Sequence, residues 1–356
     1  MPTGGKSTLT QFLIEERRRA PDATGDLNAL VTDVSLACKA ISRKVAYGGL
    51  SGALGSAGTS DGQGEAPKTL DAMSTGMFLR ANEWGGHVAG MVSKEMAGPY
   101  VLPHQFPRGK YLLAFDSLDG SPNTDVNVAV GSIFSVLRAV TPGQNPKLGD
   151  FLQPGTAQVC AGYAIYGPST MLILSLGEGT HAFTLDPLLG EWVLSHPNLK
   201  IPPSSREFAI NVSNSRFWES PVKRYVDECM AGRTGPRGDD FTMRWIASLV
   251  AETHRILMRG GVFMHPWDNK DVTKPGHLQL LYEANPISML IEQAGGMAST
   301  GQQRLMDVKP QSLHQTIGFI FGCSEEVARI EAYHRETPDH DHVSPLFSRR
   351  GLFEVD

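Results

Sequence analysis

One short stretch, Tyr111–Asp125 (YLLAFDSLDGSPNTD), constrains the fold and the chemistry of this chain more than any other. Its first residues are apolar and predict a buried strand, which runs directly into Asp116 and Asp119. Carboxylates at the carboxyl end of a strand lie where the sheets of α/β proteins place their ligands. Because a turn separates the two acids, both can converge on one hard cation, with the Leu118 carbonyl oxygen as a further ligand. The stretch therefore predicts a metal site at the end of a strand.

The residues after Asp119 extend this prediction to an anion. Ser121 followed by Pro122 is typical of a helix N-cap and first helical position, so the amides beyond Gly120 would point outward and bind an anion. A metal beside a phosphate is the arrangement used for phosphoryl transfer to water. The residues alone leave a second interpretation open, in which the segment is an Asp-Gly turn whose acids are satisfied by hydrogen bonds.

The first half of the chain is predicted to be two helices packed on a large, mostly antiparallel sheet. Apolar residues recur at helical spacing over Asp26–Ala46, and two glycines follow that helix. A loop rich in glycine, serine and alanine is expected at Gly52–Pro67, and Thr69–Trp84 again has helical spacing. The expected strands are Val88–Val92, Tyr111–Phe115, Val126–Ala139, Gln158–Ile165, Met171–Leu176 and the stretch His181–Val193.

A proline-rich segment, His196–Ser205, predicts the boundary between two units. Beyond it strands alternate with helices, so the fold class is predicted as α/β (α+β layered), with alternating layers of helices and mixed sheets. We expect an N-terminal domain over 1–198, a C-terminal domain over 199–335 and a polar tail over 336–356. The elements expected in the second domain are the strands Phe208–Val212, Val262–His265 and Thr316–Gly322 and the helices Pro221–Met230, Trp245–Leu257, Pro286–Ala294 and Glu325–His334.

Charge and cysteine content argue against several classes of protein. The 32 basic and 37 acidic side chains give a formal net charge of −5, without the basic excess of a nucleic-acid-binding protein. The longest apolar runs, such as Thr170–Leu176, are far shorter than the roughly 18 residues of a membrane span, and the N-terminal region shows no secretory signal. Because the four cysteines are widely spaced, we expect reduced thiols in a cytoplasmic protein, without a disulfide framework or structural zinc.

The sequence around the predicted metal site is specific enough to indicate a family. The run YLLAFDSLDGSPNTDVNVAVGSIFSVLR resembles the metal-binding signature of class I fructose-1,6-bisphosphatases, within the lithium-sensitive sugar and inositol phosphatase group. The runs LTQFLIEE, FLQPGTAQVCAGYAIYGPSTML, HAFTLDP, RWIASLVAE, LLYEANPISMLIEQAGG and an LHQ near position 314 fit the same family in the same order. The resemblance implies the sugar-phosphatase fold with two subdomains.

The resemblance also implies an activity and the residues that perform it. It implies Mg²⁺-dependent hydrolysis of the 1-phosphate of fructose 1,6-bisphosphate to fructose 6-phosphate, in gluconeogenesis or the Calvin cycle, by a homotetramer that holds two or more Mg²⁺ ions. By resemblance the metal ligands are Asp116, the Leu118 carbonyl, Asp119 and Glu283; the catalytic carboxylates are Asp71 and Glu95; and the substrate-binding residues are Asp119, Gly120, Ser121, Pro122, Asn211, Arg244, Trp245, His265 and His277.

Several positions depart from the family pattern, and they surround the expected metal and phosphate groups. Lys94 stands where the family has a glutamate next to Glu95; a protonated lysine can fill the volume of a metal ion but cannot ligate one, so one metal ion can be lost. Pro122 replaces a serine and lacks two donors, and Gln279 lacks the charge of an arginine expected at the 1-phosphate. The remaining departures are His277 for a lysine or arginine, His265 and Trp245 for tyrosines, and Ser117 for a proline.

Two interpretations of these departures stay open. In the first, other groups compensate, and the chain is an active bisphosphatase whose substrate is fructose 1,6-bisphosphate or, in the same class, sedoheptulose 1,7-bisphosphate. In the second, the chain is a weakened paralogue that acts as a sugar-phosphate-binding or nucleotide-binding protein.

A second site is implied by the same resemblance. Thr24, Asp26, Lys110, Tyr111 and Arg138 resemble the elements by which family members bind AMP. A helix N-terminus with a hydroxyl and two cations suits a phosphate. The alternative is that Asp26 caps the helix while Lys110 and Arg138 are solvated.

Overall fold

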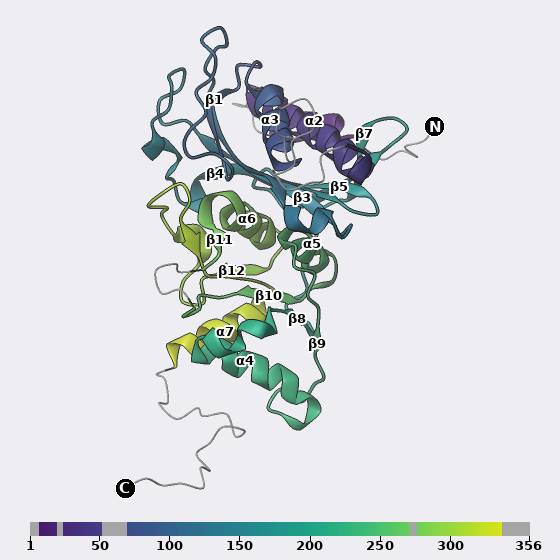
Figure 1. Cartoon of the computed structure of the whole chain (residues 1–356), viewed down its shortest axis with the longest axis vertical. Helices are drawn as coiled ribbons and strands as arrows, with labels where there is room; N and C mark the ends of the chain where they lie inside the picture. The colour runs from purple at the N-terminus through teal and green to yellow at the C-terminus, as the bar shows by residue number, and fades with distance from the viewer. Residues whose placement is uncertain (1–6, 20–23, 52–69, 271–275, 337–356) are drawn as a thin grey trace, which may run out of the picture.

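The chain folds into alternating layers of helices and sheets, stacked along its longest axis (Figure 1). The structure is a computed structural model, and it describes residues 7–19, 24–51, 70–270 and 276–336. The loop predicted at Gly52–Pro67 and the predicted polar tail beyond Glu336 lie outside these residues. The predicted fold class, with helix layers alternating with mixed sheets, is confirmed.

The first sheet has seven strands in the sequential order β1 to β7. β1 runs parallel to β2, and every later pair of neighbours is antiparallel, as the prediction of a mostly antiparallel sheet requires. The stretch predicted over His181–Val193 contains two strands, because the Asp186 carboxylate accepts two backbone N–H groups and turns the chain. The strands are β1 (Val88–Ser93), β2 (Tyr111–Asp119), β3 (Val130–Arg138), β4 (Gln158–Tyr166), β5 (Thr170–Ser175), β6 (His181–Asp186) and β7 (Glu191–His196).

Two helices, α2 (Asp26–Tyr47) and α3 (Leu70–Asn82), pack on one face of this sheet, as predicted (Figure 1). Leu30, Val34 and Ile41 of α2 are completely buried in one apolar cluster with the aromatic side chains of β2 and β3. Burial of each such side chain is worth about 1.5–3 kcal/mol, so the helical period of α2 fixes which of its faces meets the sheet.

A shorter helix, α1 (Leu9–Arg19), was not among the predicted helices. Its buried residues Leu9, Phe12 and Leu13 follow the spacing i, i+3, i+4 that indicates an amphipathic helix. The helical spacing of apolar residues was therefore present in the sequence. It involves only three residues of a short segment that ends in three arginines, so the helix was missed.

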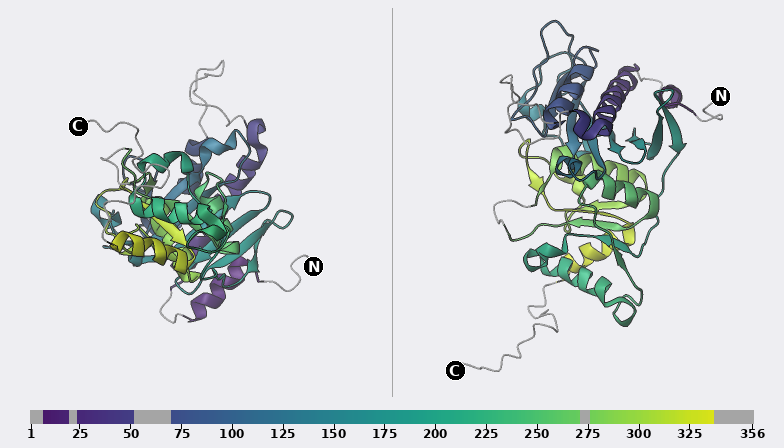
Figure 2. Two further views of the ribbon diagram at one scale, coloured as in Figure 1. Left: turned by 90° about the horizontal axis from the view of Figure 1, so that it is seen from below. Right: turned by 45° about the vertical axis from the view of Figure 1, so that its right-hand side comes forward.

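The opposite face of the seven-stranded sheet packs on α5 (Leu249–Arg259) and α6 (Asn285–Gln293). These two helices lie between the two sheets, and they share one apolar cluster with side chains from both (Figure 2). On the far side of the second sheet lie α4 (Ser220–Ala231) and α7 (Ser324–Arg335), at the opposite end of the molecule from α2. The order is thus helix, sheet, helix, sheet, helix.

The second sheet has five strands in the order β12-β14-β10-β8-β9, and a separate two-stranded sheet pairs β11 with β13. The predicted helix Trp245–Leu257 starts too early, because Ala247 has a positive φ of 60° and α5 begins only at Leu249. The strands are β8 (Glu207–Ala209), β9 (Thr242–Met243), β10 (Val262–His265), β11 (Leu278–Gln279), β12 (Met297–Ser299), β13 (Thr316–Ile317) and β14 (Phe319–Gly322).

Two expectations from composition can be compared with the described residues. Cys38, Cys160, Cys229 and Cys323 are all free and buried, each within an apolar cluster. Of the helices that the structure describes, none combines the length and apolar character needed to cross a bilayer.

Candidate metal and phosphate site

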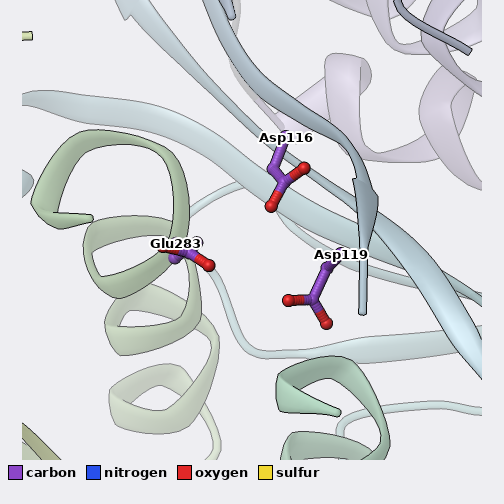
Figure 3. A group of neighbouring side chains, drawn as sticks. All are labelled: Asp116, Asp119 and Glu283. Carbon is purple, nitrogen blue, oxygen red and sulfur yellow. The ribbon is translucent and has the colours of Figure 1, made fainter. Parts of the chain in front are cut away.

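Three buried carboxylates meet where β2 faces the turn that precedes α6 (Figure 3). Asp116 and Asp119 come from β2, and Glu283 comes from a π-helical turn, Leu280–Ala284, that leads into α6. One ligand oxygen from each residue lies within 4.8 Å of the others, and the residues are 1%, 5% and 3% exposed. Oxygen donors at this density are the ligand set that Mg²⁺ and Ca²⁺ prefer.

A bulge in β2 brings the two aspartates to the same side of the sheet. Asp116 pairs with Ile133 of β3 and Asp119 pairs with Gly131, so β2 uses one more residue than β3 between these pairs. In a regular strand, residues three apart would point to opposite faces, and the extra residue restores a common side. Gly131 is required opposite the bulge, since a Cβ there would lie 2.3 Å from the carbonyl oxygen of Ala164.

The turn after the aspartates differs by one residue from the prediction. Gly120, and not Ser121, is the N-cap, because it adopts a left-handed conformation with a φ of 76° that suits glycine. Ser121 and Pro122 begin a single 3₁₀ turn, Ser121–Thr124, which does not continue into an α-helix. The Asn123 side chain donates to the Ala247 carbonyl, so the turn is held against the residues that precede α5.

Lys94 reaches into the carboxylate cluster from the end of β1. Its Nζ lies 2.8 Å from Oδ2 of Asp116 and 3.0 Å from Oε1 of Glu283. Burial lowers the pKa of Lys94, but the charges of Asp116, Glu283 and Asp119 raise it by more, so the pKa lies well above its usual value and the ammonium stays protonated. Burial, together with the charge of Asp116, raises the pKa of Asp119 to about 7.

Backbone amides hold the carboxylates in place, and sequence reasoning missed all of them. The N–H of Leu118 donates to Oδ1 of Asp116 at 3.2 Å, and the N–H of Val250 donates to Oδ2 of Asp119 at 3.0 Å. The N–H of Gln279 donates to Oε2 of Glu283 at 2.6 Å. Since every residue type except proline supplies such a donor, no sequence signal could have identified them.

The two carboxylates expected to be catalytic lie beside this cluster. Asp71, at the start of α3, is partly exposed and hydrogen-bonds Ser121, while Glu95 follows Lys94 and is exposed. Burial raises the pKa of Asp71, and so does the charge of Asp116. Burial also raises the pKa of Glu95, with further contributions from Asp71 and Asp116.

The residues expected at the sugar phosphate are only partly brought together. Asn211 and His265 line one small pocket with the buried Asp268, a carboxylate that sequence reasoning missed. His277 contacts Asp268 at 3.4 Å between Nε2 and Oδ2 and lies against the His265 ring. Burial lowers the pKa of His265 to about 4, so its imidazole is neutral near pH 7.

Two further expected residues lie outside that pocket lining. Arg244 is half-exposed, and its Nε lies 3.5 Å from Glu207. The Trp245 ring stacks on Phe263, with ring planes 4° apart. The side chain of Gln279 interacts with His314, whose Nδ1 lies 3.2 Å from Oε1 of Gln279.

The residues expected at a nucleotide site do lie together. Nζ of Lys110 is 2.8 Å from Oδ2 of Asp26 and 3.3 Å from Oγ1 of Thr24, while Tyr111 and Arg138 are direct partners across β2 and β3. The part of the alternative in which Asp26 caps its helix is wrong, because Gly25 is the N-cap of α2, whereas Arg138 is exposed, as that alternative expects. Asp26 lies instead in the first helical turn and pairs with Lys110.

Comparison with known proteins identifies the family. The N-terminal domain model of fructose-1-6-bisphosphatase matches residues 7–197, and the C-terminal domain model matches residues 201–335. The chain belongs to the fructose-1,6-bisphosphatase family. A class 1 fructose-1,6-bisphosphatase of Methylibium petroleiphilum is 74% identical over 353 residues, 99% of both chains, and one of Hydrogenophilus thermoluteolus is 62% identical over 348 residues, 97% of both.

Solved structures of fructose-1,6-bisphosphatases have the same fold as this chain. The holo form of Leishmania major fructose-1,6-bisphosphatase superimposes with a TM-score of 0.83 at 34% identity, over 92% of this chain and 99% of that one. Its T-state superimposes with a TM-score of 0.79, over 93% and 99%. The resemblance found in the sequence, and the sugar-phosphatase fold that it implies, are thereby confirmed.

Proposed function

We propose that this chain hydrolyses the 1-phosphate of fructose 1,6-bisphosphate to fructose 6-phosphate, with Mg²⁺ held by the carboxylate cluster. The observation that carries the proposal is the convergence of Asp116, Asp119 and Glu283 within 4.8 Å, at the end of a strand, in a member of the fructose-1,6-bisphosphatase family. A relative that is 74% identical over nearly the whole chain is named a class 1 fructose-1,6-bisphosphatase.

The proposed metal ligands are these three carboxylates and the Leu118 carbonyl. Their oxygen donors fit a hard divalent cation on the side of Asp119 that the Lys94 ammonium leaves open, and the surrounding amides fix the carboxylate orientations. When bound, Mg²⁺ supplies positive charge for the phosphate and acidity for the attacking water. The residues themselves would hold the ion, and their burial would keep bulk water away from it.

Asp71 and Glu95 are the proposed acceptors of the proton that the attacking water loses. A general base works best when its pKa approaches the working pH, and the pKa of each of these carboxyls is raised, first by burial. Both lie beside the cluster, and Asp71 is also linked to Ser121 in the turn. The amides of Gly120 and Ser121 are the proposed donors to the 1-phosphate, beside Pro122, which has no N–H to give.

The sugar end of the substrate is proposed to contact Asn211, Arg244, Trp245, His265 and His277. Asn211 and His265 share one pocket lining, which supports this assignment for them. The buried Asp268 in the same lining repels a phosphate, and His277 lies against it. We therefore expect weaker phosphate binding at this end than a lysine and tyrosines would give.

Conversion of fructose 1,6-bisphosphate to fructose 6-phosphate, measured with Mg²⁺ and with excess EDTA, tests the proposal. We expect product only with Mg²⁺, and a comparison with sedoheptulose 1,7-bisphosphate under the same conditions shows which sugar is preferred. Binding of the sugar phosphate without any turnover would instead support the non-catalytic alternative.

A nucleotide site is the second proposal, supported by the gathering of Lys110, Thr24 and Asp26 next to the Tyr111 and Arg138 pair. We expect AMP to displace the Lys110–Asp26 ion pair and bind at the start of α2. Titration calorimetry with AMP at millimolar concentration should show heat of binding, and an absence of heat would remove this proposal.

Two further proposals come from the resemblance alone. One is the cytoplasmic location. The other is the homotetramer, whose molecular mass light scattering would measure.

A further inference from the structure

The six carboxylate oxygens of the cluster are not equally available to a metal ion. Both oxygens of Asp116 are engaged, one by the Leu118 amide and one by Lys94. Both oxygens of Glu283 are engaged as well, one by the Gln279 amide and one by Lys94. Among the donors in the described part of the chain, only one reaches Asp119, at its Oδ2, which leaves Oδ1 of Asp119 open.

Lys94 is therefore bound as a cation, through hydrogen bonds to two of the carboxylates. Its ammonium bridges two carboxylates that are 1% and 3% exposed, at 2.8 and 3.0 Å, while its own side chain is 27% exposed. Charged groups this deeply buried are stable only when paired, and the pairing here is made within the chain. Between Asp116 and Glu283 the position of a cation is already filled.

We propose that Lys94 is a resident cation of this cluster, replacing one divalent ion, so that the chain binds one divalent ion fewer than the same site with glutamate at position 94. The inference rests on the proposed function only in taking the cluster as a divalent-ion site. The remaining ion is held on the side of Asp119, whose Oδ1 is open.

Charge balance supports this assignment. The three buried carboxylates carry three negative charges when ionised, and the Lys94 ammonium reduces the sum to two, which one divalent ion neutralises. With glutamate at position 94 the same group would carry four negative charges, which two divalent ions neutralise. The substitution thus changes the number of divalent ions by one without leaving a buried charge uncompensated.

The test is the number of Mn²⁺ ions bound per chain, measured with Mn²⁺ alone by the electron paramagnetic resonance of the unbound ion. We expect Lys94→Glu to bind one more Mn²⁺ than the unchanged protein at saturation. Lys309→Glu, with the same change in charge at an exposed position, is the matched control and should bind the unchanged number. Lys94→Gln serves as the second variant if Lys94→Glu fails to fold. It removes the ammonium charge and supplies a neutral amide oxygen, so it should also bind one more Mn²⁺, with lower affinity.

Equal Mn²⁺ numbers for the unchanged protein and both Lys94 variants would overturn the inference, because they would mean that Lys94 leaves the cluster when the ions bind. Absence of Mn²⁺ binding in every variant would overturn it too. The count does not depend on turnover. A gain of one ion without any fructose 6-phosphate formation would sustain the inference and contradict the proposed function, while metal-dependent turnover with equal counts would do the reverse.

Discussion

Asp119→Asn is expected to lower the Mg²⁺-dependent kcat/KM for fructose 1,6-bisphosphate by about 10³-fold. Asp119 supplies the carboxylate oxygen that no described donor occupies, so its charge is the one most available to a divalent ion. Removal of one partner from a buried charged group costs about 3–5 kcal/mol, and each 1.36 kcal/mol is a factor of ten in rate. The asparagine oxygen can still accept from the Val250 amide, so the fold should be kept.

The matched control for this variant is Asp125→Asn, which removes an exposed carboxylate six residues further along the same segment. We expect it to keep kcat/KM within about twofold, since a surface charge of this kind contributes little. Steady-state kinetics at saturating Mg²⁺ measure both variants. An Asp119→Asn enzyme within tenfold of the unchanged protein would show that Asp119 is not a metal ligand.

Arg237→Met should lower the free energy of unfolding by about 3–5 kcal/mol. The Arg237 guanidinium donates at 2.8 Å to both oxygens of Glu326, and the two side chains are 9% and 4% exposed. The Tyr225 hydroxyl donates to Glu326 at 2.6 Å, but it carries no charge. Without Arg237, the Glu326 carboxylate is left buried between α4 and α7 without a counter-ion.

Chemical denaturation monitors this loss, and two further variants show its cause. Arg233→Met breaks the exposed pair with Asp240, whose side chains are 77% and 63% exposed, and should cost at most about 1 kcal/mol. The double variant Arg237→Met with Glu326→Gln should recover part of the stability, because the uncompensated charge is gone while the Tyr225 bond remains. A loss for Arg237→Met no larger than for Arg233→Met would contradict the assignment.

The elements that sequence reasoning predicted well are those with a clear period. The helical spacing of Asp26–Ala46 matches α2 to within one residue, and the apolar run at Val262–His265 is β10 without any change. The boundary that it misplaced at α5 depends on a single backbone conformation. Ala247, with its positive φ, delays the start of α5, and such a conformation has no signature in the residue type alanine.

The candidate site shows the same division. The spacing of Asp116 and Asp119 indicated a shared cation, but the β2 bulge that makes them converge is set by pairing with β3. Glu283 came from the family resemblance, because its distance along the chain gives no hint of contact with β2. Asp268 was missed, since one aspartate in a loop has no pattern, and only the fold places it beside Asn211 and His265.

The most direct test of the central claim is fructose 6-phosphate formation by the purified chain, followed through removal of divalent ions and their return. We expect formation from fructose 1,6-bisphosphate with Mg²⁺, its loss in excess EDTA and its recovery when Mg²⁺ is restored. Turnover that continues after the ions are removed, or no turnover at any Mg²⁺ concentration, would contradict a metal-dependent bisphosphatase site at Asp116, Asp119 and Glu283.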